Sequence, residues 1–445
     1  MKPSNLLETC AVLALLLTLS VACGADDEPA PTLAPVRDVQ PTQAPAPSTT
    51  SPPPPSATPM PPEPTPTPLP TEAPTAEPSS WYGAGTVALF SVGDYESGDL
   101  YALGGDGATQ LVFSDVGRDA RVSPDGRWLG FVRVDYDGRS TLELHDAQTG
   151  ASRHITSDAT SGMLRFAFDR TSRRLAYLHL DPPDENLPPW GLVVVDLKSD
   201  TAVRYDTLMT FEDRSSLPGA PVGWSGVASS GDELILDTFM PFTEGGWAGV
   251  WAVTLPPDGA PAAPNTLSRR ELLPAAPAYF SSLYFAPDGQ SLAFLGRDLD
   301  YVPENYFPEF YDLAVNRLET VALVDGARTL VLNVDDGSAL ARVLAWSPGG
   351  NRLLFAQGSY GGGEYFGTLT LKSSDLSGAV VEHGMLTLPP MSYLSDMAWC
   401  VESHALYVAW GNDDNTQRLF SVDLNAAIST ELSAGPLVEI LACAP

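Results

Sequence analysis

A short segment in which a tight turn separates two apolar stretches recurs along residues 81–445, and it constrains the fold more than any other feature. Its clearest copies are residues 122–131, 285–294 and 346–355, with turns of the type Pro-Asp-Gly or Pro-Gly-Gly. Weaker copies lie at residues 168–177, 224–236 and 399–408. Proline fixes φ and glycine supplies the positive φ of a tight reversal, so each copy predicts a β-hairpin. The region is expected to consist of repeated β units.

A third strand with alternating apolar residues is predicted after each hairpin, followed by a fourth. The third strands are expected at residues 100–103, 142–145, 192–195, 250–253, 321–324, 369–371 and 419–422, which makes seven repeats. The hairpin itself occurs only six times within the chain. Residues 441–445 align with residues 344–348 and stop at the turn, while residues 86–90 form the N-terminal strand. Pairing of these two segments completes the first repeat and closes a ring without exposed inner edges.

With their Ser-Pro-Asp-Gly turn, the repeats resemble TolB-type and WD-like propeller repeats over residues 81–445. The resemblance implies an all-β domain, a seven-bladed β-propeller of four-stranded blades closed by the N- and C-terminal strands. It is informative about fold only, because propellers include binding modules, scaffolds and enzyme-associated domains.

The N-terminal segment predicts export. Residues 6–22 are largely apolar and too short for a comfortable membrane span, and residues 19–24 read Leu-Ser-Val-Ala-Cys-Gly. This segment resembles the lipobox of bacterial lipoproteins, which implies a signal peptide over residues 1–22 and a lipidated Cys23. Ser20 stands where leucine is usual, and Lys2 is the only basic residue before the apolar stretch. Ordinary secretory cleavage and an uncleaved anchor are the alternatives.

Residues 23–80 are predicted to form a disordered linker. After Cys23 and Gly24 they consist almost entirely of Pro, Thr, Ala, Ser and acidic residues, which favour polyproline II and cannot bury a core. The propeller at residues 81–445 is thus expected outside the cytoplasm, lipid-anchored to the bacterial cell membrane or envelope.

The charge of the chain restricts its partners. A formal net charge of -31 and a pI near 4.2 argue against nucleic acid and anionic lipid, so membrane contact is expected only through the lipid anchor. A monomer without a cofactor is predicted. The acidic turns at residues 135–138, 333–337 and 412–415 could offer oxygens to structural calcium, but Asp, Asn and Gly are also ordinary turn residues.

No catalytic or metal-binding residue is predicted. Residues 223–227 read Gly-Trp-Ser-Gly-Val, which resembles a serine-hydrolase nucleophile elbow except that Val227 replaces the final glycine. Trp224-Ser225 also aligns with Trp346-Ser347 of the repeat. The five histidines show no metal-ligand spacing, and no glycine-rich phosphate loop occurs.

Cys400 and Cys443 suggest a possible disulfide. The repeat alignment places them on the innermost strands of the seventh and first blades, which are neighbours in a closed ring. They differ by one alignment position, so they point to opposite faces of their sheets, and those faces confront each other. Two free buried thiols are the favoured alternative, because packed sheets stand about 10 Å apart and only the narrow inner region allows a bond.

The candidate binding face is set by the connections between second and third strands, which lengthen at residues 181–190, 239–248, 297–318 and 357–366. Aromatic residues mixed with acidic ones on loops suit recognition of an extracytoplasmic protein, peptide or glycan, although they could equally pack their own loops. The candidate residues are Trp190, Phe242, Trp247, Tyr301, Tyr306, Phe307, Tyr311 and Tyr360. The leading hypothesis is a non-enzymatic binding or scaffold lipoprotein. A propeller lyase or hydrolase, or an accessory subunit of a separate peptidase, is the alternative.

Overall fold

The computed structural model describes residues 80–94, 97–134, 139–160, 165–180, 190–205, 208–210, 216–227, 233–239, 247–256, 267–274, 283–297, 315–362, 365–386, 388–389, 392–411 and 415–444. Contacts divide the chain into Met1–Ala73 and Pro74–Pro445, and every described residue belongs to the second unit. The predicted signal peptide, Cys23 and most of the linker lie outside the described residues. Within the described part of the chain, no helix is both long and apolar enough to cross a membrane.

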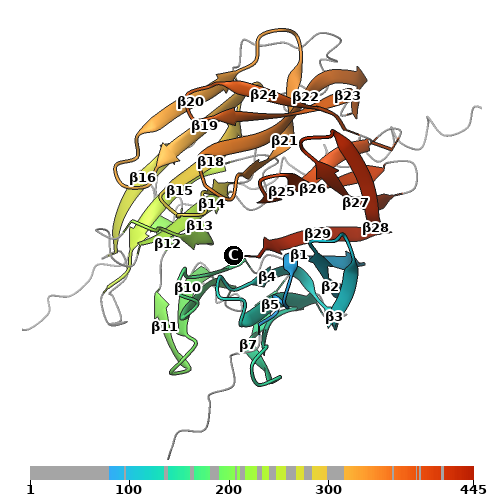
Figure 1. Ribbon diagram of the computed structural model, residues 1–445. Coiled ribbons are helices and arrows are strands. Elements are labelled where there is room, and N and C mark those ends of the chain that lie inside the picture. Colours follow the sequence, from blue (N-terminus) through green and yellow to red (C-terminus); the bar gives the residue numbers. More distant parts are fainter. Residues whose placement is uncertain are drawn as a thin grey trace, which may run out of the picture. The chain divides into compact units, whose positions relative to one another are not determined.

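Seven antiparallel sheets stand around a common centre (Figure 1), as predicted for a seven-bladed propeller. From the centre outward, blade 1 contains β29 (Leu437–Cys443), β1 (Thr86–Gly93), β2 (Gly98–Gly104) and β3 (Thr109–Val116). Blade 2 contains β4 (Arg118–Val122), β5 (Trp128–Val134), β6 (Arg139–Asp146) and β7 (Ser152–Thr160). Blade 3 contains β8 (Phe166–Phe168), β9 (Arg174–Leu180), β10 (Trp190–Asp196) and β11 (Thr201–Tyr205).

The remaining blades repeat this order, with one addition. Blade 4 contains β13 (Ser216–Trp224), β14 (Glu233–Phe239), β15 (Trp247–Thr254) and β16 (Ser268–Pro274), and the short β12 (Leu208–Thr210) pairs with β13 as an unpredicted fifth strand. Blade 5 contains β17 (Tyr284–Phe285), β18 (Ser291–Gly296), β19 (Arg317–Ala322) and β20 (Arg328–Asn333). Blade 6 contains β21 (Ala339–Trp346), β22 (Arg352–Gly362), β23 (Tyr365–Asp375) and β24 (Val380–Met385). Blade 7 contains β25 (Ser392–Val401), β26 (His404–Gly411), β27 (Thr416–Asp423) and β28 (Ile428–Gly435).

The repeated turn joins the first and second strands as the sequence predicts. Gly126, Gly289 and Gly350 adopt φ values of 72°, 64° and 69°, the left-handed conformation that glycine reaches without a steric penalty. In blade 2 the Gly126 amide donates to the Ser123 carbonyl at 2.8 Å. The Trp128 amide donates to the Ser123 hydroxyl oxygen at 2.8 Å. These bonds account for a short turn between an innermost strand and its neighbour.

Two predicted segments need correction. The third strand expected at residues 321–324 is β19, which begins at Arg317 and ends at Ala322, because Leu323 and Val324 already belong to the next turn. The connection expected at residues 357–366 is mostly strand, since β22 and β23 continue through it and pair Tyr360 with Phe366 and Gly362 with Tyr365. The glycine-rich sequence there indicated a loop, but backbone pairing across the hairpin extends both strands.

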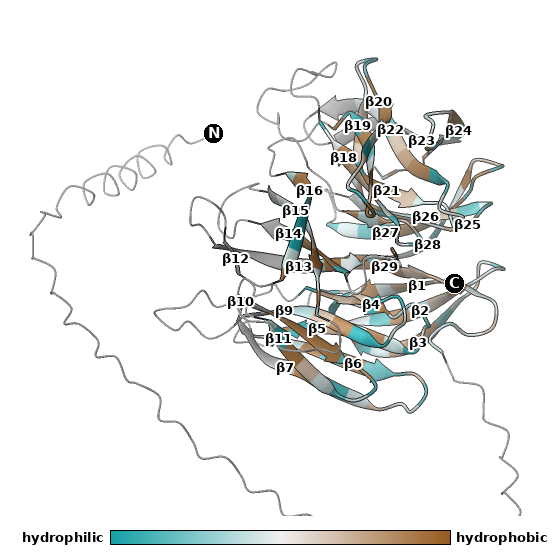
Figure 2. Cartoon of the chain, turned by 90° about the vertical axis from the view of Figure 1, so that its left-hand side faces the viewer, coloured by the Kyte–Doolittle hydropathy of each residue, from teal (hydrophilic) through white to brown (hydrophobic). Residues whose placement is uncertain are grey.

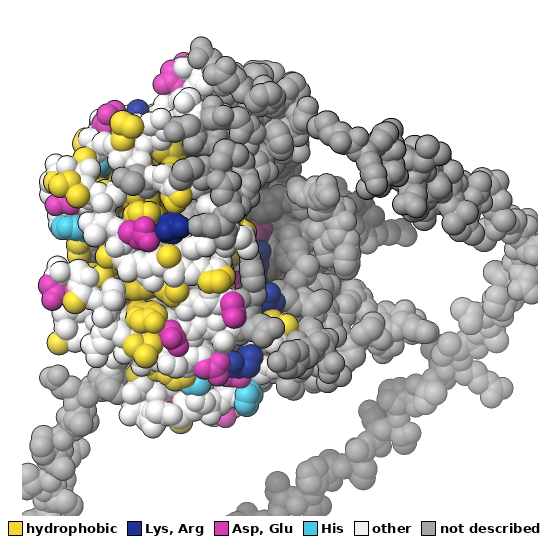
Figure 3. Space-filling model, turned by 90° about the vertical axis from the view of Figure 1, so that its right-hand side faces the viewer, with side chains coloured by type: hydrophobic (Ala, Val, Ile, Leu, Met, Phe, Trp, Pro, Cys, Tyr) yellow, Lys and Arg dark blue, Asp and Glu magenta, His cyan; other side chains and the backbone are white. Residues whose placement is uncertain are grey.

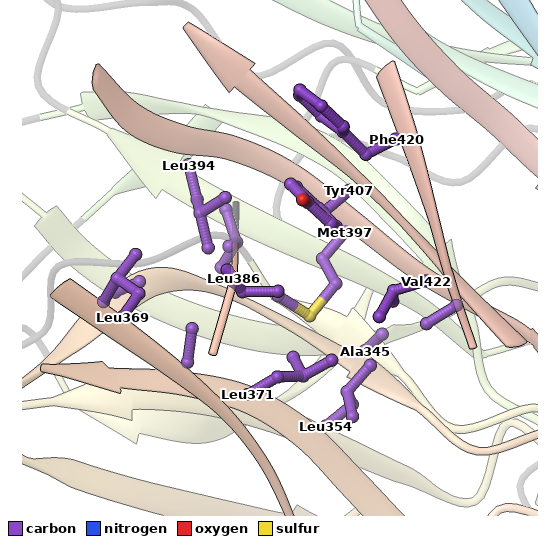
Figure 4. Close-up of a cluster of buried hydrophobic side chains, with 14 of the residues drawn as sticks. Ala345, Leu354, Leu369, Leu371, Leu386, Leu394, Met397, Tyr407, Phe420 and Val422 are labelled. Atoms are coloured by element: carbon purple, nitrogen blue, oxygen red, sulfur yellow. The ribbon is translucent and has the colours of Figure 1, made fainter. Parts of the chain in front are cut away.

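Apolar side chains fill every interface between neighbouring blades. Among the described residues seven hydrophobic clusters occur, and each joins one blade to the next, including blade 7 to blade 1. Figure 4 shows the cluster between blades 6 and 7, where Leu354 and Leu371 face Met397 and Tyr407. Hydrophobic residues run along strands such as β5 and β6 (Figure 2). Replacing a fully buried leucine with alanine typically lowers the free energy of unfolding by roughly 2–5 kcal/mol. Packing between the blades therefore makes a large contribution to the stability of the ring.

The two ends of the domain meet in blade 1. Strand β29 pairs antiparallel with β1, with Ala88 opposite Cys443 and Ser91 opposite Glu439. The Ala444 amide adds a bond to the Val87 carbonyl at 3.0 Å. The predicted closure by the N- and C-terminal strands is therefore confirmed, and β1 has partners on both sides.

The residues before β1 dock on the turn of blade 2. The Trp81 amide donates to the Gly126 carbonyl at 2.8 Å, and the Trp81 ring meets Phe113 edge to face at 5.5 Å. A Cβ atom added to Gly126 would clash with the Ser80 hydroxyl and with the Tyr82 ring, whose Cε2 would be only 2.9 Å away. Gly126 is thus required both for its backbone conformation and for the space that Tyr82 occupies.

We predict that Gly126→Ala lowers the free energy of unfolding by about 2–4 kcal/mol, measured by guanidinium denaturation. Gly107→Ala is the matched control, because Gly107 has a φ of 81° and open space around its Cβ position. It should cost only about 1–2 kcal/mol, the penalty of the left-handed conformation. Equal losses for the two variants would contradict close packing of Tyr82 on the turn.

Candidate functional site

A cavity of about 440 Å³ lies at the centre of the ring. The described residues that line it come from five innermost strands or the turns next to them: β4, β8, β13, β25 and β29. They are Asp119, Ala120, Arg121, Val122, Pro124, Ala167, Phe168, Val222, Gly223, Asp396, Glu439, Ile440 and Leu441. Three carboxyl groups and one guanidinium therefore share the central channel.

The outer rim has a different character. On the side shown in Figure 3, hydrophobic and acidic side chains are interspersed. Several outer-strand residues are exposed and apolar, namely Leu111, Leu330, Val380, Val381, Met385 and Ile428. Converging charged groups gather in the channel, so we place the candidate site there.

Irregular pairing in the innermost strands aims side chains into the channel. The β4–β5 register shifts between Arg118 and Arg121, and Asp119 within this bulge has a φ of 52°. A second shift lies between Leu394 and Asp396 of β25. β-Bulges re-aim side chains and are frequent beside functional sites, and a left-handed aspartate stores local strain. The bulges explain how a regular repeat presents acidic groups at its centre.

Asp396 accepts two backbone hydrogen bonds inside the channel. Its Oδ1 accepts from the Met397 amide at 2.8 Å, and its Oδ2 accepts from the Ile440 amide of β29 at 3.1 Å. Burial raises the pKa of Asp396 to about 6, although both amides act in the opposite direction. The side chain therefore links blade 7 to blade 1 and is mostly ionised only above that pH.

Glu439 is the second carboxyl group of the cavity whose pKa is clearly raised. Burial, together with the negative charges of Asp119 and Asp396, raises its pKa to about 7. The backbone amides of Asp119 and Ala120 donate to its carboxylate and limit this rise. Glu439 thus exchanges a proton near neutral pH, in a position between two other acids.

Arg121 supplies the positive charge of the site. Burial among the channel walls lowers its pKa, opposed by the nearby Asp119 and Glu439. Its side chain is exposed to the solvent of the channel, and the surrounding protein removes part of its hydration. The Arg121 guanidinium lies 5.8 Å from the ring centre of Phe166, which helps to hold it against the wall.

The charged cluster lies toward one end of the channel. Arg118, next to Asp119, pairs with Val132, and β5 ends at Val134 just before its connection to the third strand. Glu439 pairs with Ser91 near the corresponding end of β1. The cluster is therefore nearer the face that carries the connections between second and third strands than the face with the short repeated turns.

The cysteine pair is bonded in the structure. Cys400 of β25 and Cys443 of β29 form a disulfide with a Cα–Cα distance of 4.9 Å. Their position at the seam between blades 7 and 1 is the one that the repeat alignment predicts. Free thiols, the favoured alternative from sheet spacing, do not occur here, because both residues lie on innermost strands where the blades converge.

The predicted aromatic binding face is not described. Phe242, Tyr301, Tyr306, Phe307 and Tyr311 lie outside the described residues, as does Cys23. Trp190 begins β10, Trp247 begins β15 and Tyr360 lies within β22, but their side chains are also outside the description. The binding role of this face stays a prediction.

The sequence motifs considered as nucleophile or calcium sites form turns in the structure where they are described. The Ser225 amide donates to the Glu233 carbonyl at 2.9 Å, and its hydroxyl oxygen accepts from the Val227 amide at 3.2 Å, as in a turn. Asp336 accepts from the Ser338 amide and hydroxyl, which lowers its pKa. Within the described ranges no three His, Cys, Asp or Glu residues are grouped so as to hold a metal.

One Ser-His-Glu arrangement occurs in blade 2. The Ser152 hydroxyl lies 2.7 Å from Nδ1 of His145, whose Nε2 is 3.6 Å from Oε2 of Glu143. The imidazole packs between Phe113 and Phe131, with ring centres 4.7 and 5.0 Å away. Residues 145 and 152 are simply opposite each other in β6 and β7. We therefore assign His145 to packing between blades 1 and 2.

Sequence reasoning missed the channel residues Asp119, Arg121, Asp396 and Glu439. The repeat alignment contained a signal. Asp119 and Asp396 occupy the same alignment position, four residues before Ser123 and Cys400. In blade 6 this position, four residues before Ser347, holds the apolar Val343. Charged residues on strands that should be apolar indicate a function or a special partner. Only the ring brings these distant positions together.

No family model matches the sequence, and no curated protein matches it. Solved structures of similar fold include prolyl oligopeptidase B from Galerina marginata, at 12% identity and a TM-score of 0.50 over 80% of this chain and 52% of that one. The periplasmic gluconolactonase of Pseudomonas aeruginosa gives 14% identity and a TM-score of 0.48 over 81% and 100%. TolB from Acinetobacter baumannii gives 14% and 0.38 over 68% and 64%. This chain thus spans about half of the prolyl peptidase it matches, and at these identities the similarity shows the fold alone.

We predict that Glu439→Gln stabilises the protein at pH 8 by about 1–2 kcal/mol and has little effect at pH 4. A native pKa of about 7, above the ordinary 4.5, means that the folded state holds its proton longer. Wild-type stability should therefore fall as pH rises from about 4.5 to 7 and then level off. Urea unfolding at several pH values measures this change.

The matched control is Asp336→Asn, because hydrogen bonds from Ser338 lower the pKa of Asp336. Its carboxylate stabilises the fold above its unfolded pKa, so this variant should be less stable at pH 8 and equal to wild type only in acid. If Glu439→Gln instead destabilised the protein at pH 8, the ionised Glu439 carboxylate would not be unfavourable for folding, which would contradict this interpretation.

Proposed function

We propose that the protein is an extracytoplasmic, lipid-anchored binding module without catalytic activity, whose ligand reaches the charged cluster in the central channel. The observation that carries this proposal is the convergence of Asp119, Asp396 and Glu439 in one cavity. Burial raises the pKa values of Asp396 and Glu439, and such carboxyl groups reduce folding stability at neutral pH. Groups that cost stability and converge in a cavity are candidates for function.

The chemistry of the cavity suggests the ligand class. Carboxylates accept hydrogen bonds from ammonium, amide or hydroxyl groups, and Arg121 donates to carbonyl or carboxylate oxygens. A protein segment, a peptide or a glycan offers both kinds of group. Such a ligand would enter from the face of the second-to-third-strand connections, where the predicted aromatic residues, among them Trp190 and Tyr360, would add contacts.

The cellular location rests on sequence. The lipobox-like residues 19–24 and the proline-rich composition of residues 25–80 support an anchored domain outside the cytoplasm. A disulfide between Cys400 and Cys443 suits the same location, because disulfides persist in oxidising compartments. Membrane contact through the lipid alone and a monomeric state belong to the same proposal.

A second candidate function is acid–base catalysis in the channel. The pKa values of about 6 for Asp396 and about 7 for Glu439 are those of groups that can take up and release a proton near neutral pH. A lyase or hydrolase reaction would use one as base and the other as acid. Fold does not decide between the two functions, because a peptidase, a lactonase and TolB share it.

We predict that Arg121→Ala and Glu439→Gln each weaken ligand capture at least tenfold. The experiment probes arrays of envelope-derived peptides and glycans with residues 81–445, followed by calorimetry with the best ligand. Glu382→Gln is the control, because Glu382 is exposed on the outer strand β24. Unchanged affinity in both channel variants would contradict a channel site.

Incubation of the protein with the ligands found in this way distinguishes a binding module from an enzyme. Recovery of intact ligand after long incubation supports a binding module, whereas turnover lost in Glu439→Gln supports the acid–base alternative. A variant with residues 298–314 shortened tests the predicted loop face independently, since it leaves the channel cluster in place.

A further inference from the structure

Strand β29 is held from two sides by different kinds of bond. On one side it pairs with β1 of its own blade. On the other side two of its amides donate to side chains of blade 7: Val438 to Oε1 of Gln417 at 2.8 Å, and Ile440 to Oδ2 of Asp396 at 3.1 Å. Gln417 is buried, so its bond to Val438 is protected from water. Blade 7 thus satisfies the inner edge of the strand that completes blade 1.

The disulfide adds a covalent link at the end of the same strand. Cys443, the last residue of β29, is bonded to Cys400 of β25. Residues 438, 440 and 443 are therefore all attached to blade 7, two by hydrogen bonds and one by a covalent bond. These attachments fix the position of β29 across the seam.

Strand β29 also carries part of the channel site. Glu439, Ile440 and Leu441 line the cavity, and Glu439 alternates with the two residues that bond to blade 7. Displacement of β29 would move Glu439 away from Asp119 and Asp396. The geometry of the site consequently depends on the attachment of the seam.

We propose that the Cys400–Cys443 disulfide is a redox latch that controls the channel site, opened by a dithiol. This inference rests on the proposed function, since it assigns a regulation to the same channel. In the bonded state β29 is fixed and the charged cluster is assembled. In the reduced state the end of β29 separates from blade 7 while the ring stays folded.

A dithiol would reduce the Cys400–Cys443 disulfide in two steps. A thiolate of the dithiol attacks one sulfur of the pair, forms a mixed disulfide and releases the other cysteine as a thiolate. The second thiol of the dithiol then closes its own disulfide and frees the remaining cysteine. Two electrons pass to the cysteine pair, and both cysteine sulfurs end as thiols after taking up protons.

Cys400 itself is buried, so a reductant would approach the bond from the side of Cys443 and from a groove at the seam. Cys400 lines a groove of about 400 Å³ between blades 7 and 1, whose walls include Leu103 and Leu432. Cys443 is partly exposed at the end of its strand. A disulfide that a thiol can reach is more readily exchanged than one enclosed in a core.

The reduced ring should remain closed. Pairing of β29 with β1 runs from Leu437 to Cys443, and the apolar cluster between blades 7 and 1 contains Phe90, Leu406 and Val408 besides the cysteines. Loss of one link at a strand end favours local opening over global unfolding. The change is therefore expected in residues 437–443 and the channel cluster.

We predict that dithiothreitol accelerates hydrogen exchange of the Val438 and Ile440 amides at least tenfold, measured by NMR under native conditions. The Leu344 amide of β21 is the internal control, because β21 completes blade 6 without a covalent link. Circular dichroism verifies that the reduced protein stays folded. The variant Cys400→Ser/Cys443→Ser should show the fast exchange without reductant and no response to it.

A titration of Glu439 by NMR gives a second readout that does not need a ligand. In the bonded protein its pKa is about 7, and in the reduced protein it should move toward the ordinary value of 4.5 as the carboxyl group gains water. Unchanged exchange and an unchanged titration in fully reduced, folded protein would overturn the latch. Ligand capture that is insensitive to Arg121→Ala would instead remove the channel site and leave the latch result standing.

Discussion

Pairing of β29 with β1 is the interaction on which the rest of the structure depends. Each blade is a twisted sheet with two apolar faces, and a row of such sheets would expose one face at either end. Closure into a ring removes both exposed faces at once, because blade 7 then covers blade 1. The seventh hydrophobic cluster and the disulfide both follow from this one strand pairing.

Closure also creates the candidate site. The charged residues that line the channel come from three innermost strands, β4, β25 and β29, and none of them lies in one of the motifs that the sequence analysis identified. Asp119 and Glu439 become neighbours only because the C-terminal strand β29 completes blade 1, next to β4 of blade 2. A channel built from such contributions combines strain, as in the left-handed Asp119, with incomplete hydration of Glu439. Both features reduce stability and indicate that the centre of the ring is adapted to something other than folding.

Much of the architecture could be predicted because local chemistry repeats. The Pro-Asp-Gly or Pro-Gly-Gly turn, whose glycine has a positive φ, marks the three clearest hairpins, and the count of third strands against hairpins shows the closure. The relation between Cys400 and Cys443 followed from strand alternation. The extension of β22 and β23 was missed because pairing between backbones overrides the preference of a glycine-rich sequence for a loop. The channel cluster was missed because bulges, which decide where Asp119 and Asp396 point, leave little trace in a single sequence.

The position of β29 has a consequence for biogenesis. A chain that emerges from its N-terminus first presents β1 without an inner partner until residues 437–443 have followed. Contacts between segments so distant in sequence form slowly, because the loop-closure entropy of the whole domain opposes them. Until then β1 offers an unpaired edge to other chains, which is a hazard for aggregation. Folding of this domain after synthesis should therefore be limited by its last strand, and protection of the nascent β1 edge should matter more than the speed of any single blade.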